Sequence, residues 1–249
     1  MYVMISYKIN KGYTMKILIT AGPTSEYIDS VRKITNTSTG SLGVEIAHEL
    51  LKIEDVEITF LAGEGSKLPN GNINIENFIS TNDAYKYMEA NSKHFDVIIH
   101  SAAIADYRIG GVFRIMSNGE LDEVNFTGKL SSDEECYYVK MERNIKIVDY
   151  IKEWNPNAIL ISFKLLDDVT AEELISVARK QLERTNSDYV IANDLTNIGD
   201  NHKAYIVSKS DVIEKETKAE IAKGIYNILH FPEFSVQFNP LYGLSNEEI

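Results

Sequence analysis

Short apolar runs rich in β-branched residues alternate along this chain with amphipathic stretches, and no other feature restricts the fold as strongly. The runs that predict buried strands are residues 16–20, 56–62, 73–79, 95–101, 158–163 and 188–192. The stretches that predict helices are residues 43–52, 82–93, 144–154, 170–184 and 218–229, with Asn82 or Asp83 capping the second. This order is typical of an α/β fold. We therefore expect a Rossmann-like, mainly parallel sheet flanked by helices on both faces.

The segments outside this alternation set the expected domain organisation. Residues 204–207 and 211–214 predict a small terminal β-hairpin, whereas the Gly-, Ser- and Asp-rich stretch 102–135 predicts a long mobile loop. No change in composition divides the chain, so residues 15–230 are expected to form a single α/β domain. Residues 1–14 are expected to be a disordered extension, with Met15 as an alternative start, and residues 231–249 a C-terminal tail.

Charge and composition exclude several classes of function. A net charge of -12 argues against a nucleic-acid partner, because neutralising phosphates requires a basic face. No apolar run approaches the roughly 20 residues that cross a membrane, and no secretory signal is recognisable. The single cysteine, Cys136, excludes an internal disulfide framework, and the five histidines follow no metal-ligand spacing. We expect a cytoplasmic protein without a metal site of its own, in which an anionic ligand would need a local positive site.

The loops around the first strand and the first helix are candidates for that positive site. Glycines let backbone N–H groups approach an anion, hydroxyl groups add donors, and the start of a helix favours negative charge. Arg32 and Lys33 bring cationic side chains to the same region. A tight turn followed by an ordinary helix cap explains the pattern equally well. The candidate phosphate-binding residues are Gly22, Ser38, Thr39 and Gly40.

Three common nucleotide and hydrolase motifs are absent. The Gly40–Gly43 pair lies about twenty residues beyond the first strand, whereas a dinucleotide fingerprint occupies a tight strand–helix turn. The chain contains no G-x-x-x-x-G-K-[ST] loop and no G-x-S-x-G elbow. P-loop enzymes and serine hydrolases are therefore disfavoured.

Five further candidate residues lie at the ends of predicted strands or in the long loop. Ala105 and Asp106 come after the fourth strand, where small side chains leave room for a flat ring. Phe163 could stack on a base while Lys164 meets a phosphate. Lys129 could neutralise charge that develops on a phosphorus atom. Taken singly, each also fits a bland interpretation: a crowded strand end, a core ring or a solvated lysine.

The order and spacing of these stretches resemble the phosphopantothenate-cysteine ligases, in their stand-alone bacterial form. The stretches that carry the resemblance are residues 17–24, 28–43, 102–108, 128–130, 162–165 and 190–194. The resemblance covers nearly all of residues 15–229, and the second stretch is long and specific. It implies an acid-amino acid ligase of coenzyme A biosynthesis.

The family's chemistry has two steps. CTP with Mg²⁺ would convert the carboxylate of 4′-phosphopantothenate into an acyl-cytidylate, and the amine of cysteine would then form the amide of phosphopantothenoylcysteine. ATP in place of CTP stays open, because the sequence does not display the base-recognition contacts. The resemblance also implies a homodimer, with no nucleic acid and no membrane among the partners.

The resemblance also assigns roles to individual residues. It implies that Asn36 contacts the activated carboxyl group, Arg32 holds the same region or the anionic end of the substrate, and Lys129 stabilises the transferring phosphoryl group. The residues expected to bind the nucleotide and its phosphates are Gly22, Ser38, Thr39, Gly40, Ala105, Asp106, Phe163 and Lys164. Many members carry further lysines where this chain has Ser131 and Ser132, which bears on how the loop would grip a triphosphate.

Two other classes of function share this fold class. An NAD(P)-dependent Rossmann oxidoreductase is disfavoured by the misplaced glycine pair. A non-catalytic nucleotide-binding module is the second alternative. Convergence of Arg32, Asn36 and Lys129 on one site would argue against such a module, and scattered positions would favour it.

Overall fold

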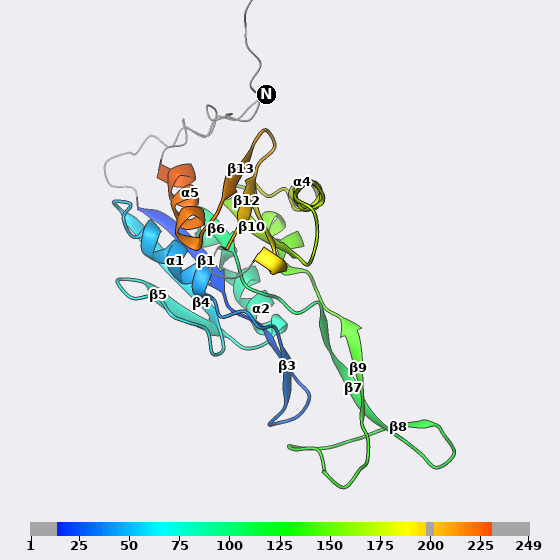
Figure 1. Cartoon of the computed structure of the whole chain (residues 1–249). Helices are drawn as coiled ribbons and strands as arrows, with labels where there is room; N and C mark the ends of the chain where they lie inside the picture. Colours follow the sequence, from blue (N-terminus) through cyan, green and yellow to red (C-terminus); the bar gives the residue numbers. More distant parts are fainter. Residues whose placement is uncertain (1–13, 198–201, 231–249) are drawn as a thin grey trace, which may run out of the picture.

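The centre of the molecule is an eight-stranded sheet in the order β13-β12-β11-β10-β6-β1-β4-β5 (Figure 1). The computed structural model describes residues 14–197 and 202–230. The six strands β5, β4, β1, β6, β10 and β11 run parallel to one another, and β12 and β13 extend the sheet as an antiparallel hairpin. The strands are β1 (Met15–Ala21), β4 (Val56–Gly63), β5 (Asn74–Phe78), β6 (Val97–His100), β10 (Ile159–Leu166), β11 (Tyr189–Asp194), β12 (Ala204–Val207) and β13 (Val212–Lys215). The strand order reverses between β1 and β6, as in doubly wound Rossmann-like folds.

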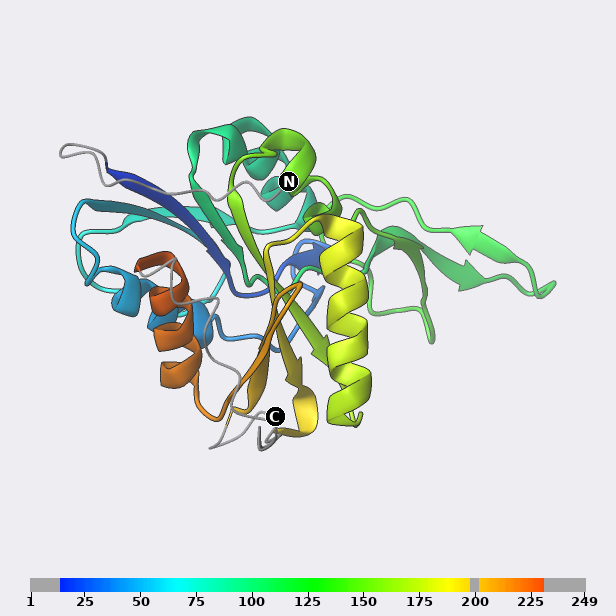
Figure 2. The same cartoon turned by 90° about the horizontal axis from the view of Figure 1, so that it is seen from above.

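Helices cover both faces of this sheet (Figure 2). Helices α1 (Ser41–Leu50) and α5 (Lys218–His230) pack on the face that carries Ile17 and Ile19. The other face, which carries Leu18, is covered by α2 (Thr81–Asn91), α3 (Ile151–Trp154) and, over β11 and β12, α4 (Ala171–Thr185). Neighbouring residues of β1 therefore enter different cores because strand side chains alternate between faces. The short 3₁₀ helices are η1 (Ser92–His94), η2 (Ile147–Asp149) and η3 (Leu195–Asn197).

The predicted α/β architecture and the terminal hairpin are confirmed, with two corrections at helix boundaries. Neither Asn82 nor Asp83 caps α2: Ser80 is the cap, and Asp83 completes a capping box with it. The stretch 144–154 is not one helix, because it divides into η2 and the four-residue α3. The tail at 231–249 and residues 1–13 of the expected extension lie outside the described residues.

The segment 102–135 is not the long irregular loop that its composition predicts. It contains β7 (Tyr107–Ile115) and β8 (Leu121–Glu123), which join β9 (Tyr138–Arg143) in a three-stranded antiparallel sheet. This sheet, called the arm below, projects from one edge of the molecule (Figure 1). Ion pairs of Arg114 with Asp122 and Glu134 link its segments. An exposed sheet held by charged side chains buries few apolar residues, so its sequence lacks the apolar run of a core strand.

A second small element lies beside the arm. Strands β2 (Ser25–Tyr27) and β3 (Lys33–Thr35) form a hairpin with its tip at residues 28–32. Glu26 anchors the hairpin, because its Oε1 accepts hydrogen bonds from the backbone N–H of Thr81 and from Nδ2 of Asn144. Of the helices in the described part of the chain, none is long and apolar enough to span a bilayer.

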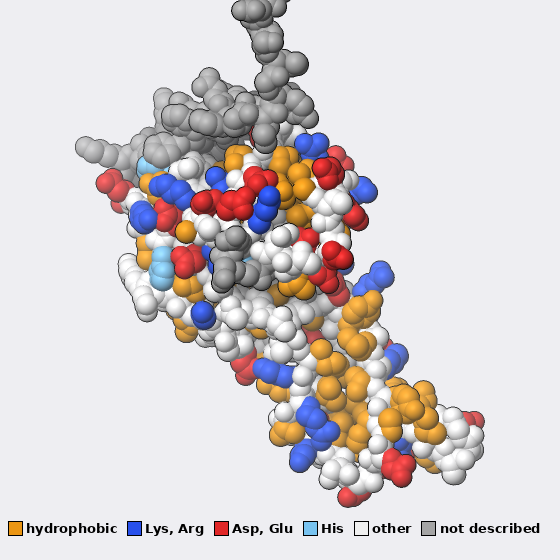
Figure 3. Space-filling view, viewed as in Figure 1, with side chains coloured by type: hydrophobic (Ala, Val, Ile, Leu, Met, Phe, Trp, Pro, Cys, Tyr) orange, Lys and Arg blue, Asp and Glu red, His pale blue; other side chains and the backbone are white. Residues whose placement is uncertain are grey.

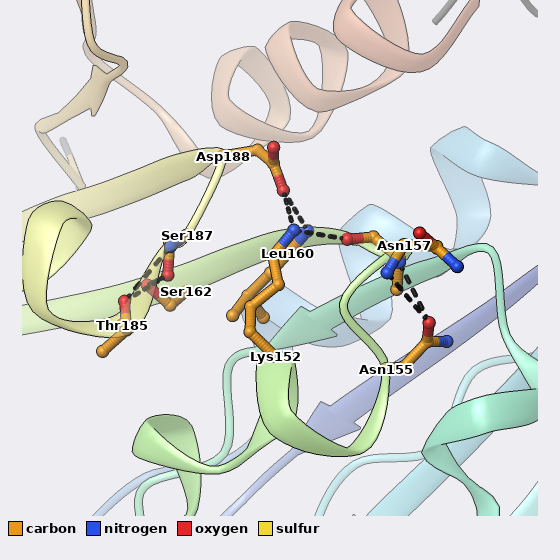
Figure 4. Close-up of polar contacts among 9 residues, drawn as sticks. Lys152, Asn155, Asn157, Leu160, Ser162, Thr185, Ser187 and Asp188 are labelled. Atoms are coloured by element: carbon orange, nitrogen blue, oxygen red, sulfur yellow. Dashed lines mark hydrogen bonds and ion pairs between the residues drawn. The ribbon is translucent and has the colours of Figure 1, made fainter. Parts of the chain in front are cut away.

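A polar network fixes the amino ends of β10 and β11 on the edge opposite the strands' carboxyl ends (Figure 4). Oδ2 of Asp188 accepts a hydrogen bond from the backbone N–H of Leu160 at 2.8 Å and pairs with Nζ of Lys152 at 2.8 Å. Oδ1 of Asn155 accepts hydrogen bonds from the backbone N–H groups of Asn157 and Ala158. These side chains hold the register at which β10 enters the sheet.

The Asp188 network predicts a stability change. Asp188→Ala should lower the free energy of unfolding by roughly 1–2 kcal/mol, because the N–H of Leu160 and the ammonium of Lys152 lose a charged acceptor. Urea unfolding followed by circular dichroism measures the change. Asp167→Ala is the control, since Asp167 is exposed and makes no hydrogen bond or ion pair with the described residues. Equal unfolding midpoints for both variants would contradict the role of the network.

Candidate active site

The chain segments that leave β1 and β6 run side by side where the strand order reverses. Pro23 and Ala103 form a parallel bridge, the N–H of Ala103 donates to the carbonyl of Gly22 at 2.8 Å, and the N–H of Thr24 donates to Ala103 at 3.2 Å. The N–H of Ala105 in turn donates to Oγ1 of the buried Thr24 at 2.8 Å. Ligands of open α/β sheets bind at such a reversal point. The predicted residues Gly22 and Ala105 are thus brought together there.

The start of α1 lies against the same point. Gly22 and Gly40 both have left-handed backbone angles, with φ of 80° and 72°, which favour glycine. A Cβ on Gly22 would lie 1.6 Å from Oγ of Ser66, and one on Gly40 would lie 3.3 Å from the backbone nitrogen of Gly22. A side chain at Gly22 would clash with Ser66, whereas at Gly40 the backbone angle is the stronger reason for glycine. Gly40 caps α1 without a side-chain hydrogen bond, so the first N–H groups of the helix keep capacity for an anion.

Hydroxyl groups and one lysine surround the start of α1. Ser38 and Thr39 accept only long hydrogen bonds of 3.4 Å, from the backbone N–H groups of Gly40 and Ser41. Nζ of Lys218 donates to Oγ of Ser41 at 2.9 Å and forms no ion pair with the described residues. Sequence reasoning missed Lys218. The available signal was a cation in the first turn of a helix, where the macrodipole disfavours it.

The predicted catalytic residue Asn36 also reaches the reversal point. Its Nδ2 donates to the carbonyl of Ala103 at 3.0 Å, and its side chain is otherwise exposed. Asp106 lies at the start of the arm, where it is exposed and 3.8 Å from Nζ of Lys146. An amide and a carboxylate therefore flank the paired loops.

Phe163 and Lys164 do not share a face of the sheet. Phe163 packs against the core beneath α1 and α5, with Ile161 of the same strand. Since side chains alternate along β10, Lys164 lies on the opposite face, away from the start of α1. On the Phe163 face, by the same alternation in β11, lies Asn193, which was not among the predicted site residues. Asn193 is 5% exposed and its Nδ2 has no hydrogen-bond partner among the described residues, which is a signal that only the structure provides.

The tip of the β2–β3 hairpin, which includes Arg32, contacts both neighbours of Lys129 in the sequence, Gly128 and Leu130. Nη2 of Arg32 donates to the carbonyl of Leu130 at 3.0 Å, and its Nε pairs with Asp29 at 3.1 Å. Asn36 lies at the base of the hairpin, four residues further along an extended strand, so its Cα is roughly 13 Å from that of Arg32. Within one chain, Asn36 therefore lies at the base of the hairpin, whereas Arg32 and the segment that carries Lys129 lie at its tip. The ammonium of Lys33 is already neutralised by an ion pair with Glu64.

The electrostatics at the ends of β1 and β6 include a buried imidazole. Nδ1 of His100 lies 2.9 Å from Oγ1 of Thr20, and burial lowers the pKa of His100 to about 4. His100 is therefore neutral at pH 7. In the described ranges 14–197 and 202–230, no group of three or more His, Cys, Asp or Glu side chains could hold a metal ion.

A family model covers most of the chain. The model described as the DNA/pantothenate metabolism flavoprotein C-terminal domain matches residues 13–230. A curated relative is the coenzyme A biosynthesis bifunctional protein CoaBC of Thermococcus kodakarensis, 33% identical over 220 residues, which span 85% of this chain and 50% of the relative. The chain spans about half the length of this relative and of two further CoaBC proteins that it matches.

Two solved structures share the fold. The DNA/pantothenate metabolism flavoprotein from Streptococcus pneumoniae is 35% identical, with a TM-score of 0.78 over 87% of this chain and 99% of that one. The C-terminal domain of a coenzyme A biosynthesis bifunctional protein CoaBC is 25% identical, with a TM-score of 0.68 over 89% and 96% of the two chains. The Rossmann-like fold is therefore common to this chain and both structures.

Burial of His100 predicts a pH-dependent stability. The unfolded chain binds a proton near the ordinary pKa of 6.5 and the folded chain only near 4, so stability is lost as pH falls through this window. His100→Asn, which can keep the contact with Thr20, should show less of this loss, by about 2–3 kcal/mol between pH 7 and 4.5. Urea unfolding of both proteins at pH 7, 5.5 and 4.5 measures the difference. Parallel pH profiles would contradict a neutral buried imidazole.

Proposed function

The chain belongs to the family of DNA/pantothenate metabolism flavoprotein C-terminal domains, and from that premise we propose that it is a phosphopantothenate-cysteine ligase. The observation that supports this most is the gathering of Gly22, Gly40, Asn36 and Ala105 where the strand order reverses. Relatives carrying this domain bear the name coenzyme A biosynthesis bifunctional protein. Because the chain matches only half of these relatives, the proposed activity is that of the matched C-terminal domain alone.

The first proposed step activates a carboxylate. A carboxylate oxygen of 4′-phosphopantothenate attacks the α-phosphorus of CTP, the bond to the β-phosphate oxygen breaks, and pyrophosphate leaves. The acid is then an acyl-cytidylate, whose phosphate is a good leaving group. The start of α1, with Ser38 and Thr39, would receive phosphate oxygens through N–H and hydroxyl donors. Lys218, bonded to Ser41, would add positive charge beside them.

The second proposed step forms the amide. The amine of cysteine attacks the acyl carbon, the carbon–oxygen bond to the nucleotide breaks, and CMP and a proton are released. Asn36 would orient the acyl group, because its amide is fixed on the carbonyl of Ala103 at the edge where the reaction takes place. Phe163 and Asn193, on the face covered by α1, would border the nucleotide. Lys164 is a less direct candidate, since alternation directs it to the other face.

The nucleotide and the metal are the less specific parts of the proposal. Mg²⁺ bound to the triphosphate would neutralise its charge, and Asp106 is the exposed carboxylate near the paired loops that could reach it. The fit is limited to that role, because the described residues offer no cluster of three metal ligands. We propose CTP as the cosubstrate, with ATP as the alternative that a direct comparison decides.

The separation of Asn36 from Lys129 favours a site completed by a second copy of the chain. A lysine that stabilises the transferring phosphoryl group must lie within hydrogen-bond distance of it, whereas the segment that carries Lys129 is bound to the tip of the hairpin and Asn36 lies at its base. Apolar side chains gather on the arm (Figure 3), and such patches commonly mark protein interfaces. The strongly exposed ones on the arm are Tyr107, Ile115, Met116, Leu121, Tyr138 and Met141. We propose a homodimer in which Arg32 and Lys129 of one copy serve the Asn36 site of the other.

The first experiment measures pyrophosphate release with 4′-phosphopantothenate and Mg²⁺, using CTP or ATP, with and without cysteine. Release that requires 4′-phosphopantothenate is expected, and CTP should be the better substrate. Product formation should additionally require cysteine. Absence of release with either nucleotide, from folded protein, would overturn the ligase proposal. Binding of a nicotinamide cofactor would then be tested, since the oxidoreductase is the remaining enzymatic alternative.

Mixing two inactive variants tests the shared site. Lys129→Gln and Asn36→Asp should each lower turnover at least about a hundredfold, because an activating cation or an orienting amide is lost. In a mixed dimer one site carries both changes and the other carries neither. Subunit exchange should then recover about a quarter of wild-type activity, since half of the dimers are mixed and each has one intact site. Each variant incubated alone is the control, and no recovery on mixing would place Asn36 and Lys129 of one site in the same chain.

A further inference from the structure

The tip of the β2–β3 hairpin holds a buried carboxylate that reaches the segment carrying Lys129. We propose that Asp29 is a positioning residue for Lys129: it clamps the backbone on both sides of this lysine to the hairpin and leaves the ammonium free. The catalytic part of this inference rests on the proposed ligase function, whereas the clamp itself does not. Asp29 and Leu130 are 101 positions apart in the sequence.

Asp29 divides its two oxygens between a local and a distant task. Oδ1 accepts the backbone N–H groups of Val31 at 2.9 Å and Arg32 at 2.7 Å, which closes the tight turn of the hairpin. Oδ2 accepts the N–H of Leu130 at 3.1 Å and pairs with Nε of Arg32 at 3.1 Å. The side chain of Asp29 is fully buried, so each of these donors would be costly to leave without an acceptor.

Arg32 and Ser30 complete the clamp. Nη2 of Arg32 donates to the carbonyl of Leu130 at 3.0 Å, and the N–H of Ser30 donates to the carbonyl of Gly128 at 3.2 Å. Both neighbours of Lys129 are therefore bound to the hairpin through their backbones. The side chain of Leu130 is 3% exposed and adds an apolar anchor.

The clamp leaves Lys129 itself unengaged. Lys129 is exposed and its ammonium forms no hydrogen bond or ion pair with the described residues. Holding a catalytic group through its backbone, rather than through its charge, keeps that charge available for a phosphate. Lys129 is the one cation of the segment from Thr127 to Ser132.

The charge state of Asp29 suits a permanent clamp. Burial by itself raises the pKa of Asp29, but hydrogen bonds from Val31, Leu130 and Arg32, together with the guanidinium charge, outweigh burial and lower it below its ordinary value. The carboxylate is therefore ionised at neutral pH and accepts all of its donors at once.

Asp29→Asn separates the two tasks. The amide oxygen can keep the turn hydrogen bonds from Val31 and Arg32. The NH₂ group would face the donors of Leu130 and Arg32, so the hydrogen bond from Leu130 and the ion pair with Arg32 would be lost. Asp29→Ser is the second variant, because a hydroxyl at this position keeps a turn bond to Val31 but is too short to reach Leu130. Asp83→Asn is the matched control, since Asp83 also accepts a backbone N–H, that of Ser80 in the capping box of α2, and makes no hydrogen bond or ion pair with the described residues of the hairpin.

The clamp is tested by hydrogen exchange, without reference to activity. Exchange at the Leu130 amide should become at least about tenfold faster in Asp29→Asn and Asp29→Ser, and should be unchanged in Asp83→Asn. Unchanged protection of Leu130 in folded Asp29 variants would overturn the clamp. This measurement stands even if the wild-type chain releases no pyrophosphate, so failure of the ligase proposal is recognised separately.

The positioning role is tested by kinetics. Asp29→Asn should lower kcat for pyrophosphate release about tenfold or more with little change in KM for the nucleotide, because the loss acts through Lys129. The double variant with Lys129→Gln should then be no slower than Lys129→Gln alone. Multiplicative losses in the double variant would show that Asp29 acts independently of Lys129 and would overturn the proposal.

Discussion

The backbone pairing between residues 22–24 and residues 103–105 is the contact on which the candidate site depends. The strand order reverses between β1 and β6, and the segments that follow these two strands continue side by side. The bonds between Gly22, Ala103 and Thr24 keep these segments together one step beyond the sheet. Asn36 and the start of α1 then take their positions from the paired backbone. The rigid sheet therefore fixes the positions of the side chains in the candidate site.

The sequence was informative wherever side-chain burial repeats regularly. Core strands such as β1 and β4 are buried on both faces over most of their length, so a continuous apolar run predicts them to within two residues. The arm could not be predicted, because a sheet with exposed faces and charged cross-strand pairs lacks an apolar run, and its glycine content suggests a loop. Ser80 was missed as the cap of α2 because capping depends on where the first helical turn begins, which periodicity does not locate.

The candidate site was only partly predictable for a related reason. Gly22, Gly40 and Ala105 could be found as small residues after strands, since parallel strands end at one edge. Pairing partners that are distant in sequence could not be found in this way. Nothing in the residues around Asp29 indicates a bond to Leu130, and nothing around Lys218 indicates Ser41. The same limit applies to Phe163 and Lys164, because their neighbouring positions suggested a common site while strand alternation separates them.

The distribution of paired and unpaired cations connects the fold to the proposed chemistry. In a chain of net charge -12, most lysines near carboxylates are neutralised locally, as Lys33 is by Glu64 and Lys152 by Asp188. Lys129 differs because its segment is fixed through backbone groups, and its ammonium forms no ion pair with the described residues. An anion brought to the start of α1 would meet helix N–H groups and Lys218 on one side, and it would need a further cation only when charge develops during reaction. In the proposed homodimer that cation would come from a second copy, so the rigid sheet would hold the nucleotide while the hairpin and its bound segment would deliver the lysine.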